Sequence, residues 1–385
     1  MDELFTMSPL LDELRQTVRV FVQRRVEPHA ARADEDERFD AQLFSALGRE
    51  LGLFGLTLPS SLGGAGLEPI ATLLAIEEIS RSDPALGLSY LAQEVLYVHN
   101  VFCNAEQTQG QRLLAPVLSG DCVAAMAMSE PEAGTDVFAM QTRARRDGDA
   151  YVLDGVKQWT TNGPVAERIL VYAKSGDAAR QISAFVVERE RGGVSNGRIE
   201  RKMGMRASPT SQLVFQDCRV PLDNRVGEEH GALPGMLANL EFERLALAAQ
   251  SLGIALRCID EMSRYAIRER QAFGRFLVEF GQIQKMLSEA VAQTAAARAL
   301  LYRVAEGLGS RASGMGADAV KLSAGWVGER VSRDAIQVFG GYGYSREYPL
   351  ERLHRDAILL SIGGGTNEAM QKNLARGLQR KWSRD

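Results

Sequence analysis

The chain has 385 residues, of which 45% are hydrophobic and 24% are charged, and its formal net charge is −4 at pH 7. This is the composition of a globular protein, and a chain of this length normally folds into two or three domains. The slight negative charge and the absence of a basic patch with interleaved aromatic residues argue against a nucleic-acid partner.

The histidines and cysteines indicate neither a metal site nor a disulfide framework. The 4 histidines and 4 cysteines are scattered, so we expect no metal ligands and expect the cysteines to be small buried residues. The acidic start of the chain resembles neither a signal peptide nor a transit peptide, and no apolar run approaches the ~20 residues of a membrane span. We therefore expect a cytoplasmic, bacterial-type protein without a membrane span.

Residues 1–122 are predicted to form an N-terminal helical domain. Apolar residues at helical spacing share one face near its start, namely Leu10, Leu11, Leu14, Val18 and Phe21. Segment 56–66 is rich in glycine, proline and serine and is predicted to be a loop. Its glycines do not form the G-x-G-x-x-G pattern of a dinucleotide site.

Residues 123–233 are predicted to form a middle domain with an antiparallel β-barrel or sheet. Short runs rich in β-branched and aromatic residues begin at Tyr151, Ile169, Ile182 and Leu213. The sequences Asp147-Gly148-Asp149 and Asn196-Gly197 are typical of hairpin turns or loops.

Residues 234–385 are predicted to form a C-terminal helical domain. Long alanine-rich segments at 237–258, 284–306 and 317–338, and the tail after Thr366, favour helices that pack as a bundle. The expected fold class is α+β, with a helical bundle, a β domain and a second bundle of long helices.

Two segments of the β region carry small polar side chains and glycines. They span residues 126–136 (MAMSEPEAGTD) and residues 158–163 (QWTTNG). Their hydroxyl and backbone N–H groups suit a flat ring with a polar edge, and Gly134 allows a ligand to approach the backbone closely. Taken alone, the first segment is also typical of a surface turn.

Together, these two segments resemble the flavin-binding core of the acyl-CoA dehydrogenase family, and the resemblance covers essentially the whole chain. It implies FAD as the cofactor, with the tryptophan covering the ring and the hydroxyls bonding its polar edge. The residues that would form this flavin cradle are Met126, Met128, Ser129, Gly134, Thr135, Trp159, Thr160 and Thr161.

Two C-terminal segments resemble the family motifs Arg-x-x-Phe-Gly and Gln-x-x-Gly-Gly. The resemblance implies contacts to the FAD of a neighbouring subunit by Arg270, Phe273, Gln337, Gly340 and Gly341. A guanidinium suits a pyrophosphate because its planar fork bonds two oxygens. The chain is thus expected to form a homo-oligomer, with a tetramer as the expected state. Singly, these motifs also fit a solvated helix end and a helix C-cap.

One position departs from the family pattern beside the first of these motifs. Phe280 is followed by Gly281 where the family usually has glutamine, and Gln282 stands next to it. One cofactor contact therefore differs from the family pattern.

The segment 362–368 (IGGGTNE) retains Thr366, Asn367 and Glu368, which the resemblance implies contact the cofactor. Many family members carry the glutamate that removes the α-proton two residues before this threonine, where this chain has Gly364. Other branches place the base on an earlier helix, in a setting that Glu243 matches. Glu243 also fits a solvent-facing helix position, but the apolar run that begins at Leu245 favours a mostly buried one. A buried, unpaired carboxylate is costly unless it has a functional role.

The resemblance implies α-proton removal by Glu243 and β-hydride transfer to flavin N5, with electrons passed to an electron-transferring flavoprotein. The backbone N–H of Gly364 would bond the thioester oxygen, since glycine retains this donor. The residues expected to bind the acyl-CoA substrate are Leu96, Thr135, Glu241, Arg244, Leu247 and Gly365.

Several details are similar to the isovaleryl-CoA branch, including the segments 88–90 and 361–365, whereas Leu91, Gln93 and Glu94 depart from it. A short branched acyl chain is therefore the expected substrate. Alternatives that the sequence leaves open are a medium-chain, long-chain or terpenoid acyl-CoA dehydrogenase, a flavin oxidase or monooxygenase, and a non-catalytic acyl-CoA-binding paralogue.

Overall fold

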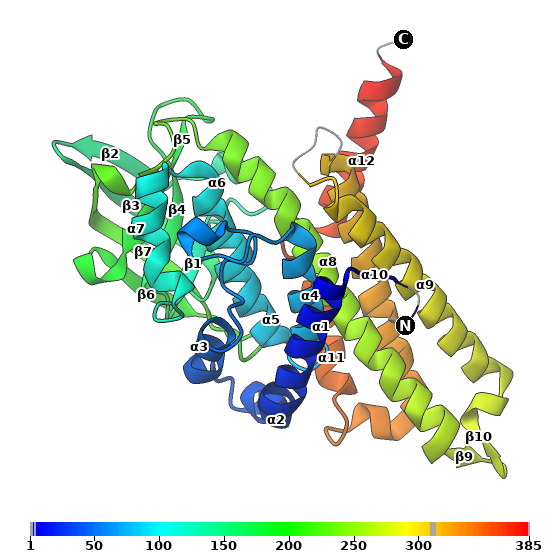
Figure 1. Ribbon diagram of the computed structural model, residues 1–385. Coiled ribbons are helices and arrows are strands. Elements are labelled where there is room, and N and C mark those ends of the chain that lie inside the picture. Colours follow the sequence, from blue (N-terminus) through cyan, green and yellow to red (C-terminus); the bar gives the residue numbers. More distant parts are fainter. Residues whose placement is uncertain (1–2, 4, 309–312, 384–385) are drawn as a thin grey trace.

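The computed structural model describes residue 3, residues 5–308 and residues 313–383. Helices come first along the chain, strands β1 to β8 follow, and long helices complete the molecule (Figure 1). This is the expected order of a helical region, a β region and a second helical region.

The first helical region packs against the long helix α8 (Leu233–Arg264). Side chains cap several of its helices: the Ser8 hydroxyl accepts from the Leu11 N–H, and the Asp83 carboxylate accepts from the Leu86 N–H. The fully buried helices α4 and α5 lack a polar face, as expected for helices at the centre of a core. The elements are α1 (Pro9–Phe21), η2 (Val22–Val26), α2 (Glu27–Glu35), α3 (Ala41–Arg49), α4 (Pro69–Ser80), α5 (Pro84–Leu91), the π-helical η4 (Ala92–His99), α6 (Asn100–Asn104) and α7 (Gln107–Leu118).

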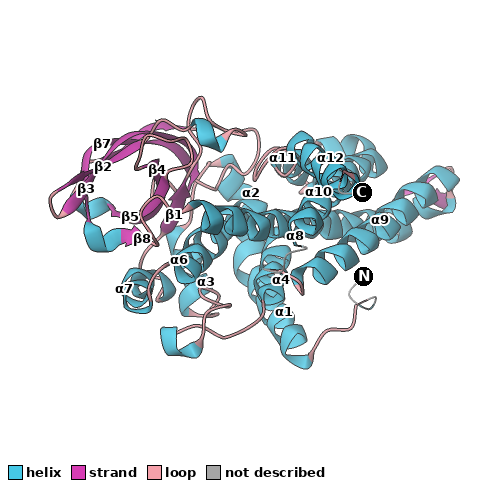
Figure 2. Ribbon diagram, turned by 90° about the horizontal axis from the view of Figure 1, so that it is seen from above, coloured by secondary structure: helices cyan, strands magenta, loops and turns pink. Residues whose placement is uncertain are grey.

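The strands form one curved sheet in the order β6-β7-β3-β2-β4-β5-β8, with β1 beside β4, gathered at one end of the molecule (Figure 2). The bounds are β1 (Ala124–Ala127), β2 (Arg143–Asp147), β3 (Ala150–Thr161), β4 (Arg168–Lys174), β5 (Ile182–Glu188), β6 (Val194–Ile199), β7 (Thr210–Pro221) and β8 (Arg225–Val226).

The sheet differs from the expected antiparallel arrangement in two pairings. Strand β4 runs parallel to β1 and, at one residue pair, to β2, so the sheet is mixed. The turn expected at 147–149 is present and joins β2 to β3, whereas Asn196 and Gly197 lie inside β6, next to an irregularity in its pairing with β7. Neighbouring-strand pairing overrides the turn preference of this dipeptide.

Helix α8 (Leu233–Arg264) lies at the centre of the helical part (Figures 1 and 2). It contacts α4, α5, η4, α9, α10 and α11, and a single apolar cluster joins the helices before the sheet to those after it. The remaining elements are η8 (Tyr265–Glu269), β9 (Gln271–Ala272), β10 (Arg275–Phe276), α9 (Gly281–Ala305), α10 (Ser313–Phe339), η10 (Gly340–Tyr344), α11 (Leu350–Leu359) and α12 (Asn367–Trp382).

The cysteines follow the expectation only in part. Cys122, Cys218 and Cys258 are buried and free, but Cys103 is exposed on α6. Across residues 5–308 and 313–383, every helix is too short or too polar to cross a membrane.

Candidate active site

Helix α8 places Glu243 in a half-buried position beside buried apolar residues. Phe242 and Leu245 on either side of it are almost fully buried, and the Oε2 atom of Glu243 is shielded from solvent without a hydrogen-bond partner. Burial raises the pKa of Glu243 to about 7, against the opposing influence of Arg244 and Lys321. A carboxyl group with a pKa near neutrality is suited to accept a proton in catalysis.

Gly364 faces the carboxyl group of Glu243 from the turn before α12. A Cβ atom placed on Gly364 would lie 3.5 Å from Oε1 of Glu243 and only 2.3 Å from Cδ1 of Leu247. The φ of Gly364 is +62°, which also disfavours any other residue there. A side chain at position 364 and the side chain of Glu243 are therefore directed at the same point in space.

Leu247 occupies the space that the missing side chain at position 364 leaves. Leu247 on α8 and Leu96 on η4 are both buried and belong to the same apolar cluster. Arg244, on another face of α8, forms an ion pair with Asp318 at 3.1 Å. Glu241, also on α8, is partly exposed, and its Oε1 lies close to Gly314 at the start of α10.

A buried ion pair holds the backbone of the flavin cradle. Nζ of Lys157 on β3 donates to the carbonyl oxygen of Met128 at 3.0 Å and to Oε1 of Glu130 at 2.8 Å. The backbone N–H of Gln158 donates to the carbonyl oxygen of Ser129 at 2.8 Å. These bonds fasten the segment that contains Met128 and Ser129 to the edge of β3.

Sequence reasoning missed Lys157 and Glu130. The sequence carries no signal for Lys157, because burial along β3 does not alternate: residues 150–153 are all buried, and the pairing with β7 is irregular between Leu153 and Gly155. No pattern in the sequence pairs Lys157 with Glu130, since their contact forms only when the chain folds.

Trp159 lies with its side chain 60% exposed although it is large and aromatic. Its φ is +60°, in the left-handed region that non-glycine residues rarely adopt. The following Asn162, also at positive φ, donates to the carbonyl oxygens of Ser89 and Ala124 and so fixes this bend. Strained backbone of this kind persists where the surroundings enforce it, and it is frequent at functional sites.

The cradle residues around Trp159 fit a flat, polar-edged ring. Ser129 and Thr161 are partly exposed, Gly134 and Thr135 are exposed, and a Cβ on Gly134 would meet open space. Met126 and Met128 are partly buried, whereas Thr160 is buried with no partner for its hydroxyl oxygen. An exposed indole, free hydroxyls and approachable backbone together provide what the isoalloxazine ring of a flavin requires.

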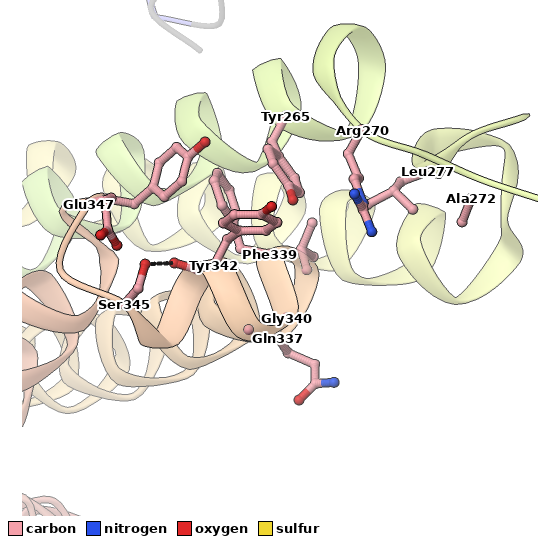
Figure 3. A pocket seen from close by; sticks show the side chains of 13 residues that line it. Tyr265, Arg270, Ala272, Leu277, Gln337, Phe339, Gly340, Tyr342, Ser345 and Glu347 are labelled. Atoms are coloured by element: carbon pink, nitrogen blue, oxygen red, sulfur yellow. Dashed lines mark hydrogen bonds between the residues drawn. The ribbon is translucent and has the colours of Figure 1, made fainter.

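The second set of expected cofactor residues forms a different site. Arg270, Gln337, Gly340 and Gly341 line an open cavity of about 1010 Å³, which Figure 3 shows between the end of α8 and η10. Aromatic rings form its wall: Tyr265 stacks on Phe339 with ring centroids 3.9 Å apart, and Tyr342 and Tyr348 lie beside them.

Phe273 is almost fully exposed in the β9–β10 hairpin near this cavity. Gly281 begins α9, and Gln282, the residue considered as a replacement for the missing glutamine, is exposed. The cavity lies at the opposite end of the molecule from the cradle on β1 and β3 (Figure 1).

The segment before α12 uses its polar groups in different ways. The Thr366 hydroxyl accepts from the Ala369 N–H and caps the helix, and Glu368 is exposed. Asn367 is buried and lies beside Lys321, whose Nζ also donates to the carbonyl oxygen of Gly365 at 2.5 Å. Lys321 was not identified from the sequence, where it is one polar residue in a long alanine-rich helix.

Comparison with known proteins agrees with this architecture along the whole chain. Models of the N-terminal, middle and C-terminal domains of acyl-CoA dehydrogenases match residues 8–121, 125–218 and 233–379. Mitochondrial isovaleryl-CoA dehydrogenase of Oryza sativa is 38% identical over 372 residues, which are 95% of this chain and 90% of that protein. A short-chain-specific acyl-CoA dehydrogenase of Clostridium acetobutylicum is 36% identical, over 95% of this chain and 97% of that protein.

A solved structure extends the similarity to three dimensions. A chain in a structure described as the electron transferring flavoprotein of Acidaminococcus fermentans superposes with a TM-score of 0.94 at 34% identity, covering 98% of this chain and 99% of that chain. The chain belongs to the acyl-CoA dehydrogenase family, whose members are flavin-dependent oxidoreductases that act on CH–CH bonds.

Proposed function

We propose that this protein is an FAD-dependent dehydrogenase of short branched acyl-CoA thioesters, with Glu243 as the base that removes the α-proton. The observation that carries the proposal is the proximity of Gly364 to the carboxyl group of Glu243, a half-buried residue whose Oε2 is shielded from solvent without a hydrogen-bond partner. A shielded carboxyl oxygen without a partner is unfavourable unless it has a function.

The residues around this point divide the reaction between them. The thioester oxygen would accept a hydrogen bond from the Gly364 N–H, which increases the acidity of the α-carbon. Glu243 would take the α-proton onto its unpartnered oxygen. Binding of the acyl chain excludes water from the carboxyl group and keeps its pKa close to the working pH.

FAD would supply the acceptor for the hydride that leaves the β-carbon. We propose that Met126, Met128, Ser129, Gly134, Thr135 and the residues Trp159 to Thr161 hold its ring, as the exposed indole and open hydroxyls allow. The 126–136 segment reaches this position because Lys157 anchors it.

The acyl pocket is proposed to be short and wide. Leu247 fills the space opposite Gly364 and Leu96 lies on η4, which packs against α8, so we propose that the two leucines close the pocket around a branch near carbon 3. Similarity to the isovaleryl-CoA dehydrogenase of Oryza sativa supports this choice, although the Clostridium acetobutylicum relative acts on short chains according to its name. One methylene group in a pocket is worth only ~1–3 kcal/mol, so few substitutions separate these preferences.

We propose that four residues contact the CoA arm at the mouth of the pocket, namely Arg244, Glu241, Thr135 and Gly365. The Nε atom of Arg244 is buried without a hydrogen-bond partner, although the guanidinium also pairs with Asp318. A pantetheine carbonyl oxygen is a suitable acceptor for this donor.

The FAD site is proposed to be shared between two copies of the chain in a tetramer. The cradle and the Arg270–Gln337 cavity lie at opposite ends of one molecule (Figure 1), so one FAD cannot touch both sets within a single chain. We propose electron-transferring flavoprotein as the electron acceptor; the structural neighbour from Acidaminococcus fermentans, described by that name, supports this.

The experiment is an anaerobic titration of the flavoprotein with butyryl-, isovaleryl-, octanoyl- and palmitoyl-CoA, following flavin absorbance. Isovaleryl-CoA should bleach the flavin fastest, and the rate should rise with pH through a midpoint near the pKa of about 7 of Glu243, because only the carboxylate accepts the proton. Glu243→Gln should retain the cofactor and bind the thioester but bleach ~100-fold more slowly or not at all.

Asp260→Asn is the matched control, because it makes the same chemical change at an exposed position of α8. Full bleaching by Glu243→Gln would show that the base lies elsewhere. Rapid reoxidation of the reduced enzyme by air, with formation of peroxide, would show that the protein is an oxidase and would contradict the proposed dehydrogenase function. A flavin that no thioester reduces would indicate a non-catalytic paralogue.

A further inference from the structure

A buried lysine lies beneath the turn that faces the proposed base. Lys321, near the middle of α10, is 1% exposed. Its Nζ donates to the carbonyl oxygen of Gly365 at 2.5 Å and lies 3.4 Å from Oδ1 of Asn367. Both acceptors are neutral, so these two hydrogen bonds do not balance the charge of the buried ammonium group, which is costly to remove from water.

The turn that Lys321 contacts has little stiffness of its own. Gly364 and Gly365 are consecutive glycines with φ of +62° and +92°, and glycine has more conformational freedom to lose than any other residue. Backbone bonds close the turn at its two ends, from Asn367 N–H to the Ser361 carbonyl and from Gly363 N–H to the Leu359 carbonyl. The bond from Lys321 ties the middle of the turn to α10.

The charge of Lys321 acts on Glu243. The two groups influence each other electrostatically: Lys321 opposes the rise in the pKa of Glu243 that burial causes, and Glu243 opposes the fall in the pKa of Lys321 that burial causes. The other ionisable groups around the pair are Arg244 on α8, Asp318 on α10, Glu368 on α12 and Tyr172 on β4. Arg244 opposes the rise in the pKa of Glu243 more strongly than Lys321 does. However, Arg244 also forms an ion pair with Asp318, whereas the two hydrogen-bond acceptors of Lys321 are neutral.

We propose that Lys321 is a positioning residue for the reaction: through its hydrogen bond to Gly365 it holds the Gly364 N–H in place beside the carboxyl group of Glu243. One side chain would thus keep the donor that polarises the thioester next to the base that takes the proton. This inference rests on the proposed function, because it assigns Lys321 a role toward the two groups proposed there.

The test compares Lys321→Met, Lys321→Gln and Lys321→Arg with wild type. Methionine removes both charge and donor, glutamine keeps a donor without charge, and arginine keeps both. Lys372→Met, at an exposed site on α12, is the matched control for the loss of a lysine charge. Each variant is measured at equal flavin content for thermal melting, for thioester binding and for anaerobic flavin reduction from mildly acidic to mildly alkaline pH.

An infrared titration of the Glu243 carboxyl band supplies a readout that does not depend on turnover. The band is assigned by its loss in Glu243→Gln. Because Lys321 favours the carboxylate, both Lys321→Met and Lys321→Gln should move the titration of Glu243 and the pH profile of flavin reduction to higher pH.

Lys321→Met should reduce flavin on the order of 100-fold more slowly even at alkaline pH, because a displaced Gly364 N–H no longer meets the thioester oxygen. Thioester binding should weaken far less than the rate falls. Lys321→Arg should keep the wild-type pH midpoint. If the methionine variant does not fold, the arginine variant is compared with wild type in its place. Lys372→Met should match wild type throughout.

The outcomes separate this inference from the proposed function. If wild type is reduced by a thioester, Glu243→Gln is not, and the uncharged Lys321 variants keep the wild-type rate and pH midpoint, then Lys321 is only a structural staple and the inference is wrong. Lower melting temperature with an unchanged midpoint leads to the same conclusion. If no thioester reduces the wild-type flavin, the proposed function itself fails and the role of Lys321 fails with it.

Discussion

At the scale of single residues, Gly364 is the position at which the structure most directly explains the residue type found in the sequence. A Cβ there would collide with Leu247 and would require a φ of +62° that other residues adopt only with strain. The packing of α8 against the turn therefore leaves no room for a glutamate side chain at position 364. The carboxylate of Glu243 lies on the other side of the same gap.

Gly364→Ala should be destabilised by about 1–3 kcal/mol and should lose most flavin reduction, because the turn must move to relieve the contact with Leu247. Thermal melting and anaerobic flavin reduction measure the two effects. Leu247→Ala introduced together with Gly364→Ala should recover part of the stability.

Gly52→Ala is the control for this prediction. Gly52 has nearly the same φ, +63°, but a Cβ there would meet no atom within 4 Å, so only the backbone strain is introduced. Equal losses in the two alanine variants would show that the Leu247 contact contributes nothing.

Prediction at this scale is possible where a residue type carries its own chemical reason. Glu243 stands before an apolar run and Gly364 leaves a gap in a known motif, so both could be proposed from the sequence. The structure places them close together, and their catalytic roles stay predictions. Lys321 could not be proposed in this way, because its role depends on Gly365, which lies 44 positions later in the chain. A lysine in a helix is normally a solvated residue, and only the folded packing makes this one buried.

At the scale of secondary-structure elements, β3 organises the proposed flavin cradle. Its Lys157 fixes the segment after β1, and its last residues bend through Trp159 in a left-handed conformation. Helical periodicity and strand composition predicted most elements, because buried faces repeat every 3.6 or 2 residues. The parallel pairing of β1 with β4 was not predicted, since pairing between distant strands leaves no local pattern.

Lys157→Met should destabilise the protein by about 3–5 kcal/mol, because it leaves Glu130 buried without its ionic partner. It should also weaken FAD retention, since the backbone of Met128 loses its hydrogen bond to Lys157. Chemical denaturation and the flavin content after gel filtration measure these effects.

Arg219→Met is the matched comparison in the same sheet. Arg219 pairs with Asp147 at 2.7 Å, but both side chains are about half exposed, so the loss should be at most ~1 kcal/mol with full FAD retention. A similar loss in both variants would argue against a special role of the Lys157–Glu130 pair.

At the scale of the whole molecule, the two sets of residues proposed to bind the cofactor lie at opposite ends of the chain (Figure 1). Arg270→Ala should therefore release FAD more readily and should weaken assembly, because the cofactor would bridge two copies. Light scattering and flavin content at several protein concentrations measure both. Arg268→Ala, which removes an exposed arginine two residues earlier, should change neither. Cofactor retention that is equal in the two variants would contradict a shared site.

The apolar cluster that joins the helices on both sides of the sheet has a consequence for how the protein loses its structure. The two helical segments are separated in sequence by about a hundred residues, yet α4 and α8 bury each other's side chains. Neither segment would survive proteolytic excision of the other. Heating should melt them in a single cooperative step, so that the three successive parts of the chain behave as two units of stability.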